Sequence, residues 1–214
     1  MTDYLFKRKT LIVSSLIGLL LFMLSYMLIL NGSLQFLDKK ISEFFLQVHS
    51  NFIDQLFIII TYLNNFESIV IFSIFISIYL IKRKRYRVLR FYFFTIIVAT
   101  ISTYFLKIST LRDRPDDGLI NLTSYSFPSW HATLSVVLSF LVFMIFIDNI
   151  KNELSKKLFM TVVFIWPLLI GFSRIYLNVH WLSDVLAGWG QGLFIVTLSA
   201  LFFKFFNEKS TSKL

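Results

Sequence analysis

Six long runs of apolar residues, separated by short polar segments, dominate the pattern of this chain. The runs are Leu11–Leu30, Phe66–Ile81, Val88–Leu106, Ala132–Ile147, Leu158–Phe172 and Val185–Phe206. A helix of about 20 apolar residues crosses the hydrocarbon core of a bilayer. The first run has this length without interruption, and each shorter run can extend into its flanks. The pattern therefore predicts six membrane-spanning helices.

The first run also has the charged start of a secretory signal peptide, because Lys7, Arg8 and Lys9 precede it. Its apolar stretch is long for a signal core, which typically has about 7–15 residues. No small-residue cleavage site follows the run. We therefore expect it to be retained as the first membrane span.

The segment between the first two runs has the pattern of an amphipathic helix. Its apolar positions recur at helical spacing, namely Leu34, Leu37, Ile41, Phe44, Phe45 and Val48, and charged residues stand between them. Such a helix either lies in the outer membrane interface or packs on the helix bundle. The run Phe52–Leu63 is too short to span alone, and Asn64 and Asn65 separate it from the next span, so we assign it to the same cap.

These elements predict an all-α integral membrane protein in which residues 1–214 form one domain. Six transmembrane helices carry an amphipathic helical cap on the outer face, between the first and second spans. The composition agrees, because 57% of the residues are hydrophobic and only 15% are charged, whereas soluble domains average about 25% charged residues. The chain has no cysteine, which excludes disulfides and thiolate chemistry.

The net charge of +9 is explained by membrane topology rather than by nucleic-acid binding. With the N-terminus in the cytoplasm, 15 of the 21 Lys and Arg residues lie in cytoplasmic segments, as the positive-inside rule predicts. The other six are Lys39, Lys40, Lys107, Arg112, Arg114 and Arg174. We therefore expect a multi-pass cell-membrane protein with both termini in the cytoplasm and with these cations on the outer side.

Four of the six outer cations belong to two clusters at the ends of apolar runs. The first cluster contains Lys107, Arg112, Arg114-Pro115 and Phe127-Pro128-Ser129-Trp130-His131, and the second contains Ser173-Arg174, His180 and Asp184. Ionisable residues near the membrane are costly and indicate a functional site. Two spans separate the clusters, so the chain returns to the same side and both clusters meet on the outer face.

The side chains of these clusters suit a phosphate ester. Arg114 and Arg174 can bind phosphate oxygens bidentately, while Lys107 acts as a point charge. Ser129 and the N–H groups from Ser129 to His131 suit the remaining oxygens if a helix starts there. Phosphoryl transfer is catalysed mainly by such positioning and charge stabilisation.

The two histidines need different roles. His180 and Asp184 are four residues apart and share one face if their segment is helical. A carboxylate that accepts one ring N–H fixes the tautomer and leaves the other nitrogen as a nucleophile. His131 could then protonate the leaving alkoxide as a general acid.

The order and spacing of these residues resemble the type 2 phosphatidic acid phosphatase family, which includes the vanadium haloperoxidases. Its three motifs match Lys107 with Arg114-Pro115, then Pro128–His131, and then Ser173-Arg174 with His180 and Asp184. The resemblance implies phosphate binding by Lys107, Arg114, Ser129 and Arg174. It further implies a nucleophile at His180, an acid at His131, a partner at Asp184, and no metal or other cofactor.

Two residues depart from, or add to, this pattern. Trp130 stands where the family usually has glycine, so we expect its N–H to bind phosphate while its indole narrows the pocket or contacts a lipid chain. Arg112 fits a second basic position before Arg-Pro, with an auxiliary role.

We therefore expect a membrane phosphatase that acts on a lipid phosphate or diphosphate at the outer leaflet through a phosphohistidine. The substrates that the family implies are undecaprenyl diphosphate, phosphatidylglycerophosphate and phosphatidic acid, and the partners are this lipid and the bilayer, without nucleic acid. Three alternatives remain: phosphotransfer between lipids at the same site, a metal-dependent hydrolase with His131, His180 and Asp184 as ligands, and a lipid-binding or transport protein that reuses the fold.

Overall fold

A computed structural model describes residues 7–211 of the chain, and the side chains of residues 7–203. The described residues form helices and no strand. The helices are α2 (Arg8–Leu30), α3 (Gln35–Gln47), α4 (Asn51–Tyr62), α5 (Phe66–Lys82), α6 (Tyr86–Thr110), α7 (Trp130–Phe146), the 3-10 helix η1 (Ile147–Asn149), α8 (Glu153–Tyr176) and α9 (Leu182–Thr211). The prediction of an all-helical membrane protein is confirmed.

Five of these helices, α2, α6, α7 with η1, α8 and α9, are long and apolar enough to cross a membrane. They coincide with five of the six predicted runs. The remaining run, Phe66–Ile81, corresponds to α5, which has 17 residues. Together with α4 it passes the same test, although the pair is bent by 47° at its break. The described residues therefore contain five or six candidate spans.

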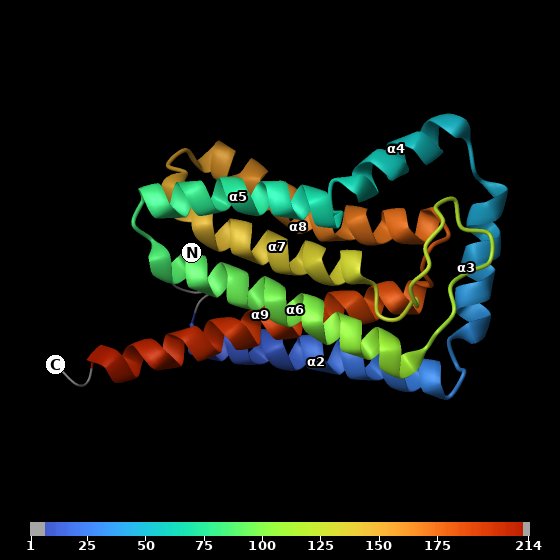
Figure 1. The fold of residues 1–214 in the computed structure, drawn as a ribbon, viewed down its shortest axis with the longest axis horizontal. Helices are drawn as coiled ribbons and strands as arrows, with labels where there is room; N and C mark the ends of the chain where they lie inside the picture. Colours follow the sequence, from blue (N-terminus) through green and yellow to red (C-terminus); the bar gives the residue numbers. More distant parts are fainter. Residues whose placement is uncertain (1–6, 212–214) are drawn as a thin grey trace.

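The spans run side by side, and α3 lies across one end of the bundle (Figure 1). The α6–α7 loop and the α8–α9 turn lie at the same end as α3, whereas the start of α2, the end of α9 and the α5–α6 turn lie at the other end. Because α7 and α8 return the chain to its starting end, the two sequence clusters lie together. This placement is the one that counting spans predicts.

The bundle is built around α7 and α9, whose buried apolar side chains pack with those of α5 and α6. Helices α2 and α9 lie so close together that a Cβ on Gly18 would be 2.8 Å from the carbonyl oxygen of Gly190. Helices α9 and α7 are equally close at Gly192, where a Cβ would lie 2.5 Å from the carbonyl oxygen of Thr133. Small residues in these positions let membrane helices approach within the bundle.

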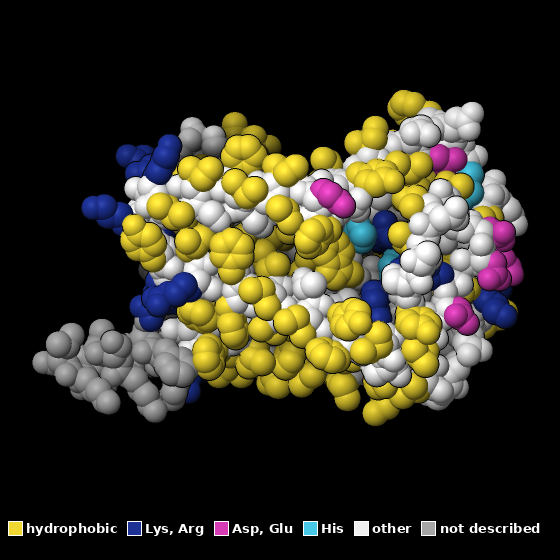
Figure 2. Space-filling view, viewed as in Figure 1, with side chains coloured by type: hydrophobic (Ala, Val, Ile, Leu, Met, Phe, Trp, Pro, Cys, Tyr) yellow, Lys and Arg dark blue, Asp and Glu magenta, His cyan; other side chains and the backbone are white. Residues whose placement is uncertain are grey.

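The outward surface of the spans is apolar. Leu16 and Leu20 of α2, for example, are 60% and 68% exposed. Figure 2 shows hydrophobic side chains covering the middle of the visible face, with Lys and Arg at one end and a mixture of Asp, Glu, His, Lys and Arg towards the other. A lipid-facing belt between two charged ends accounts for this distribution.

Helix α3 packs on the bundle with one face and leaves another exposed. Ile41 and Phe45 pack against a buried cluster of Ala132, Ile175 and Val185, while Phe36 is 70% exposed. A helix is present where the amphipathic helix is predicted, and it packs on the bundle, while its place in the membrane interface stays a prediction. Helix α4 is tied to the end of α8 by Asp54, whose Oδ1 accepts a hydrogen bond from the Tyr176 hydroxyl at 2.7 Å.

Candidate active site

The start of α7 presents backbone donors to the site. Ser129 is its N-cap residue, and its Oγ accepts a hydrogen bond from the N–H of Ala132 at 3.4 Å. The N–H groups of Trp130 and His131 lie in the first turn and therefore have no acceptor inside the helix. A helix N-terminus of this kind favours an anion.

A backbone contact joins this helix start to the start of α9. The N–H of Ser129 donates to the carbonyl oxygen of Asp184 at 3.0 Å. Gly188 allows the approach, because a Cβ there would lie 2.7 Å from the Ser129 carbonyl oxygen. The structure thus brings the second and third motifs into contact, and it uses the Ser129 N–H for this contact rather than leaving it free for phosphate.

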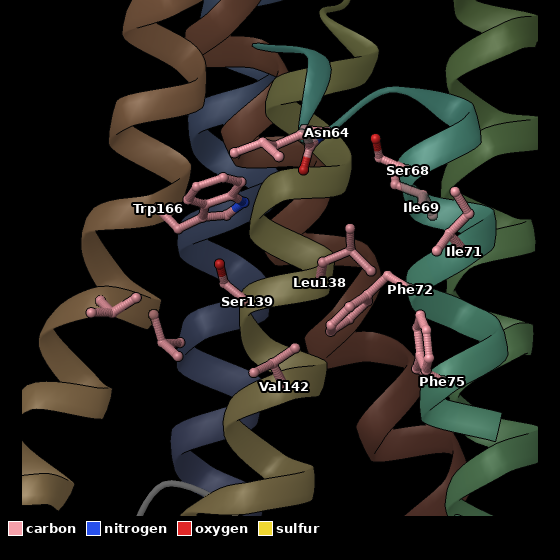
Figure 3. Close-up of a pocket in the computed structure, with 13 residues that line it drawn as sticks. Asn64, Ser68, Ile69, Ile71, Phe72, Phe75, Leu138, Ser139, Val142 and Trp166 are labelled. Carbon is pink, nitrogen blue, oxygen red and sulfur yellow. The ribbon is translucent and has the colours of Figure 1, made fainter. Parts of the chain in front are cut away.

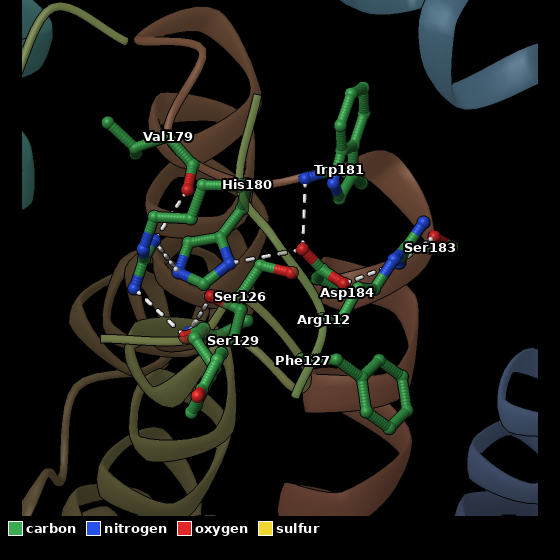
Figure 4. Close-up of polar contacts among 12 residues, drawn as sticks. Arg112, Ser126, Phe127, Ser129, Val179, His180, Trp181, Ser183 and Asp184 are labelled. Carbon is green, nitrogen blue, oxygen red and sulfur yellow. Dashed lines mark hydrogen bonds and ion pairs between the residues drawn. The ribbon is translucent and has the colours of Figure 1, made fainter. Parts of the chain in front are cut away.

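His180 lies in the turn before α9 and faces Asp184 in the first turn of that helix (Figure 4). His180 Nδ1 is 3.3 Å from Asp184 Oδ2, and the same oxygen accepts the N–H of Trp181 at 3.0 Å. The pairing therefore comes from a helix-capping turn rather than from two positions of one helix. Both side chains are buried.

The other nitrogen of His180 faces a cation. Arg114 Nη1 is 3.1 Å from His180 Nε2. A guanidinium can only donate hydrogen bonds, so Nε2 must accept and carries no proton. The proton of the neutral ring is then on Nδ1, towards Asp184. Burial, with smaller effects of Arg114, Lys107, Arg174 and His131, holds the pKa of His180 well below its ordinary value.

Arg114 and Lys107 are held by backbone carbonyl oxygens of the α6–α7 loop and, for Arg114, also of the α8–α9 turn. Arg114 donates to the carbonyl oxygens of Ser124 at 2.7 Å and Val179 at 2.5 Å. Lys107 Nζ donates to the carbonyl oxygens of Tyr125 at 2.5 Å and Ser126 at 3.0 Å. Burial lowers the pKa of Arg114 to about 10, and the nearby Asp184 opposes this shift. Arg114 is therefore cationic at neutral pH.

Arg174 is buried at the end of α8, with 2% of its surface exposed. Its Nη1 donates to Thr61 Oγ1 of α4 at 2.7 Å, and its Nε is a buried donor without a hydrogen-bond partner. A buried guanidinium with a spare N–H is a suitable ligand for a phosphate oxygen.

His131 is fixed by two residues at the break between α4 and α5. Its Nε2 is 2.8 Å from Asn65 Oδ1, and its carbonyl oxygen accepts a hydrogen bond from Asn64 Nδ2 at 3.1 Å. The Trp130 ring meets the His131 ring edge-on, with centroids 5.2 Å apart. These contacts define the orientation of the imidazole.

Trp130 lies in the first turn of α7 and is one of the residues that line an apolar groove between α5 and α6. The groove has a volume of about 340 Å³, and Ile74, Ile96 and Leu134 also line it. Trp130 has no positive φ, so it fits the backbone without strain in place of the family's glycine. Phosphate binding by its N–H stays a prediction.

A second apolar groove lies on the other side of α5, between α5, α7 and α8. It has a volume of about 470 Å³, with Phe72, Leu138 and Trp166 among its lining residues and Asn64 at its end (Figure 3). Both grooves therefore run along α5 towards the residues that contact His131. Figure 2 shows His, Lys and Arg side chains together between the apolar belt and the acidic end.

Four site contacts come from outside the two sequence clusters: Asp38 and Thr61 from the predicted cap, and Asn64 and Asn65 from the break that follows it. Asp38 binds Arg112 through a 2.8 Å ion pair. Its position carried a signal, because it stands four residues after Leu34 and three before Ile41, within the apolar stripe of the helix. The two asparagines were noted only as a break between apolar runs.

The described residues contain no group of three or more His, Asp or Glu side chains placed to hold a metal ion. The arrangement of His180 also differs from that of a metal ligand. Its free nitrogen faces the Arg114 cation, and its other nitrogen faces Asp184.

Comparisons with known proteins agree with these motifs. A sequence model of the PAP2 superfamily matches residues 88–208. Phosphatidylglycerophosphatase B of Bacillus subtilis is 36% identical over 101 residues, which are 46% of this chain and 47% of that protein. The aligned part thus spans about half the length of this curated relative.

Two solved structures share the fold. The transmembrane PAP2 type phosphatidylglycerolphosphate phosphatase from Bacillus subtilis has a TM-score of 0.75 at 24% identity, over 90% of this chain and 96% of its own. LpxE of Aquifex aeolicus has a TM-score of 0.61 at 20% identity, over 76% of this chain and 94% of its own. The motif residues, their arrangement and the sequence match over more than half of the chain lead to one conclusion: the chain belongs to the PAP2 superfamily.

Proposed function

We propose that this protein is a membrane phosphatase that hydrolyses a lipid phosphate or diphosphate through a phosphohistidine at His180. The observation that carries the proposal is the pair of contacts to the His180 ring. Asp184 faces Nδ1 and the donor-only Arg114 faces Nε2, which is the tautomer that a nucleophilic Nε2 needs.

In this mechanism Arg114, Arg174, Lys107 and the start of α7 bind the phosphate oxygens. His180 Nε2 attacks phosphorus, and the bond from phosphorus to the lipid oxygen breaks. His131 gives a proton to that leaving oxygen. Water then attacks the phosphohistidine, His131 takes a proton from it, and inorganic phosphate leaves while His180 returns to its neutral form.

The proposed substrate is lipidic because both grooves along α5 are apolar and end at residues that contact His131. Trp130 contributes its indole to the α5–α6 groove, where it would contact the lipid chain next to the phosphate. We place the site on the outer side of the membrane. The basic run Lys82–Arg85 lies at the opposite end of the bundle (Figure 1), as the positive-inside rule requires of a cytoplasmic turn.

Phosphate release by the purified protein in detergent tests this function. The panel contains phosphatidylglycerophosphate, undecaprenyl diphosphate and phosphatidic acid, each with and without EDTA. We expect release from at least one lipid, retained in EDTA and abolished by His180→Ala. Loss of activity in EDTA with rescue by a divalent ion would instead support the metal-dependent alternative.

The intermediate can be trapped with a substrate carrying ³²P in its phosphate. Rapid denaturation should leave an acid-labile label on the wild-type protein and none on His180→Ala. His49→Ala is the matched control, because His49 contacts Asp54 at 3.0 Å rather than the motif residues. A label that persists in His180→Ala would refute the assigned nucleophile.

A further inference from the structure

Arg112 is clamped between two carboxylates. Its Nη1 is 2.6 Å from Asp184 Oδ1, and its Nη2 is 2.8 Å from Asp38 Oδ2. Figure 4 shows the contact of Arg112 with Asp184 on the side away from His180. Asp184 therefore uses Oδ1 for Arg112 and Oδ2 for His180 and the Trp181 N–H.

Asp38 lies on α3, outside the matched residues 88–208. Its side chain is only 3% exposed, and it accepts hydrogen bonds from the Ser183 N–H at 3.0 Å and from the Ser183 hydroxyl at 2.5 Å. A buried carboxylate is costly unless such donors and a cation satisfy it. Its oxygens therefore have a defined set of partners, all next to Asp184.

Helix α3 makes a second polar contact on the other side of His180. The hydroxyl of Ser42, one turn after Asp38, donates to Asn178 Oδ1 at 2.7 Å. The helix is thus attached to the turn that carries His180 both before and after the histidine. A helix that only covered the bundle end would need neither contact.

We propose that Asp38 is a positioning residue for the phosphatase reaction, acting through Arg112 to hold Asp184 against His180. Asp38 contacts Arg112, Arg112 contacts Asp184, and Asp184 contacts His180, so that an anionic side chain lies on each side of the guanidinium. Each side chain thus orients the next one. This inference rests on the proposed function and adds α3 to the reaction. Without Asp38 the guanidinium would keep only Asp184 as an anionic partner.

The charges around the site set the direction of the effect. His180 is faced by Asp184 from α9 and by Arg114 from the α6–α7 loop, while Arg112 and Asp38 act through Asp184. Lys107 of α6 and Arg174 of α8 add positive charge at longer range. Removing the Asp38 charge disfavours a protonated His180, whereas removing the Arg112 charge favours it.

The test uses Asp38→Asn, Arg112→Gln and the double variant, with Glu43→Gln as control. Glu43→Gln removes the same charge from an exposed position of the same helix. The measurement is the pH dependence of kcat/KM on the best substrate of the panel. The acid limb reports the protonation of His180 in the free enzyme, and its position does not depend on how much of the sample is active.

We expect Asp38→Asn to lower kcat about tenfold or more while changing KM much less. Its acid limb should move to lower pH by about 0.5–1 unit. Arg112→Gln should move the limb to higher pH, the double variant should return it towards the wild-type position, and Glu43→Gln should match wild type.

An acid limb of Asp38→Asn at the wild-type pH, with kcat reduced only in proportion to the folded fraction measured by gel filtration, would overturn the positioning role. An Asp38→Asn variant as active as Glu43→Gln would overturn it as well. In both cases the wild type still releases phosphate, so the proposed function stands. If the wild type releases phosphate from none of the lipids, the proposed function itself fails.

Discussion

Asn65 offers the sharpest test of the general acid, because its side chain makes the hydrogen-bond contact with the His131 ring. Asn65 follows the end of α4, and its Oδ1 lies 2.8 Å from His131 Nε2. Asn65→Ala removes this partner and leaves the backbone contact from Asn64 to His131 in place. The imidazole then loses its hydrogen-bond partner and keeps the edge-on contact with Trp130.

The size of the effect follows from the value of one hydrogen bond. A buried hydrogen bond contributes about 0.5–1.5 kcal/mol net, and about 1.4 kcal/mol is a factor of ten. The correctly rotated fraction of His131 should therefore fall by about 2- to 13-fold, and kcat should fall with it. The control is Asn149→Ala, because Asn149 donates to the Tyr79 hydroxyl at 2.8 Å, away from the site residues.

The assay compares two leaving groups. An alkyl phosphate such as phosphatidic acid needs a proton on its leaving oxygen, whereas a nitrophenyl phosphate leaves as a stabilised phenolate. Asn65→Ala should lose kcat on the first substrate and retain most of it on the second. Equal losses on both substrates would refute the reasoning, because they would assign Asn65 to phosphate binding or to folding instead.

Three further predictions follow from the site and the bundle. The lowered pKa of His180 should place the acid limb of kcat/KM below the ordinary histidine value of about 6.5; the enzyme loses activity only as the pH falls through that lower value, and a limb at or above 6.5 would contradict this. Trp130→Gly should change the ratio of rates on short- and long-chain lipids, because the indole lines the α5–α6 groove; an unchanged ratio would exclude a role in chain contact. Gly192→Ala should destabilise the bundle by about 1–3 kcal/mol, since its Cβ would lie 2.5 Å from the Thr133 carbonyl oxygen; an unaltered thermal midpoint in detergent would show that α7 and α9 can separate.

The sequence was sufficient for five of the six predicted spans and for the meeting of the two clusters. Long apolar runs must become helices in a bilayer, since their backbone groups need internal partners. Counting two spans between His131 and Arg174 then placed both on one side. Neither argument needs the packing of the helices, which explains why five predicted spans and the meeting of the clusters agree with the structure, whereas α5 passes the span test only together with α4.

The contributions of α3 and α4 could not be predicted in this way. Thr61 contacts Arg174 across 113 positions of the chain, and Asp38 contacts Ser183 across 145. Hydropathy shows which segments are buried but gives no pairing between distant polar groups. In the sequence, Asn64 and Asn65 only mark a polar break between two apolar runs. In the structure, the chain bends at this break between α4 and α5, and both side chains contact His131.

The backbone contact between Ser129 and Asp184 has a consequence for how this protein tolerates sequence drift. A hydrogen bond from an N–H to a carbonyl oxygen does not depend on the side chains of the two residues that form it. The separation of the α7 and α9 starts therefore survives substitution at most flanking positions, provided that Gly188 stays small. The lipid-facing side chains take no part in this constraint and can therefore change without separating the two helix starts.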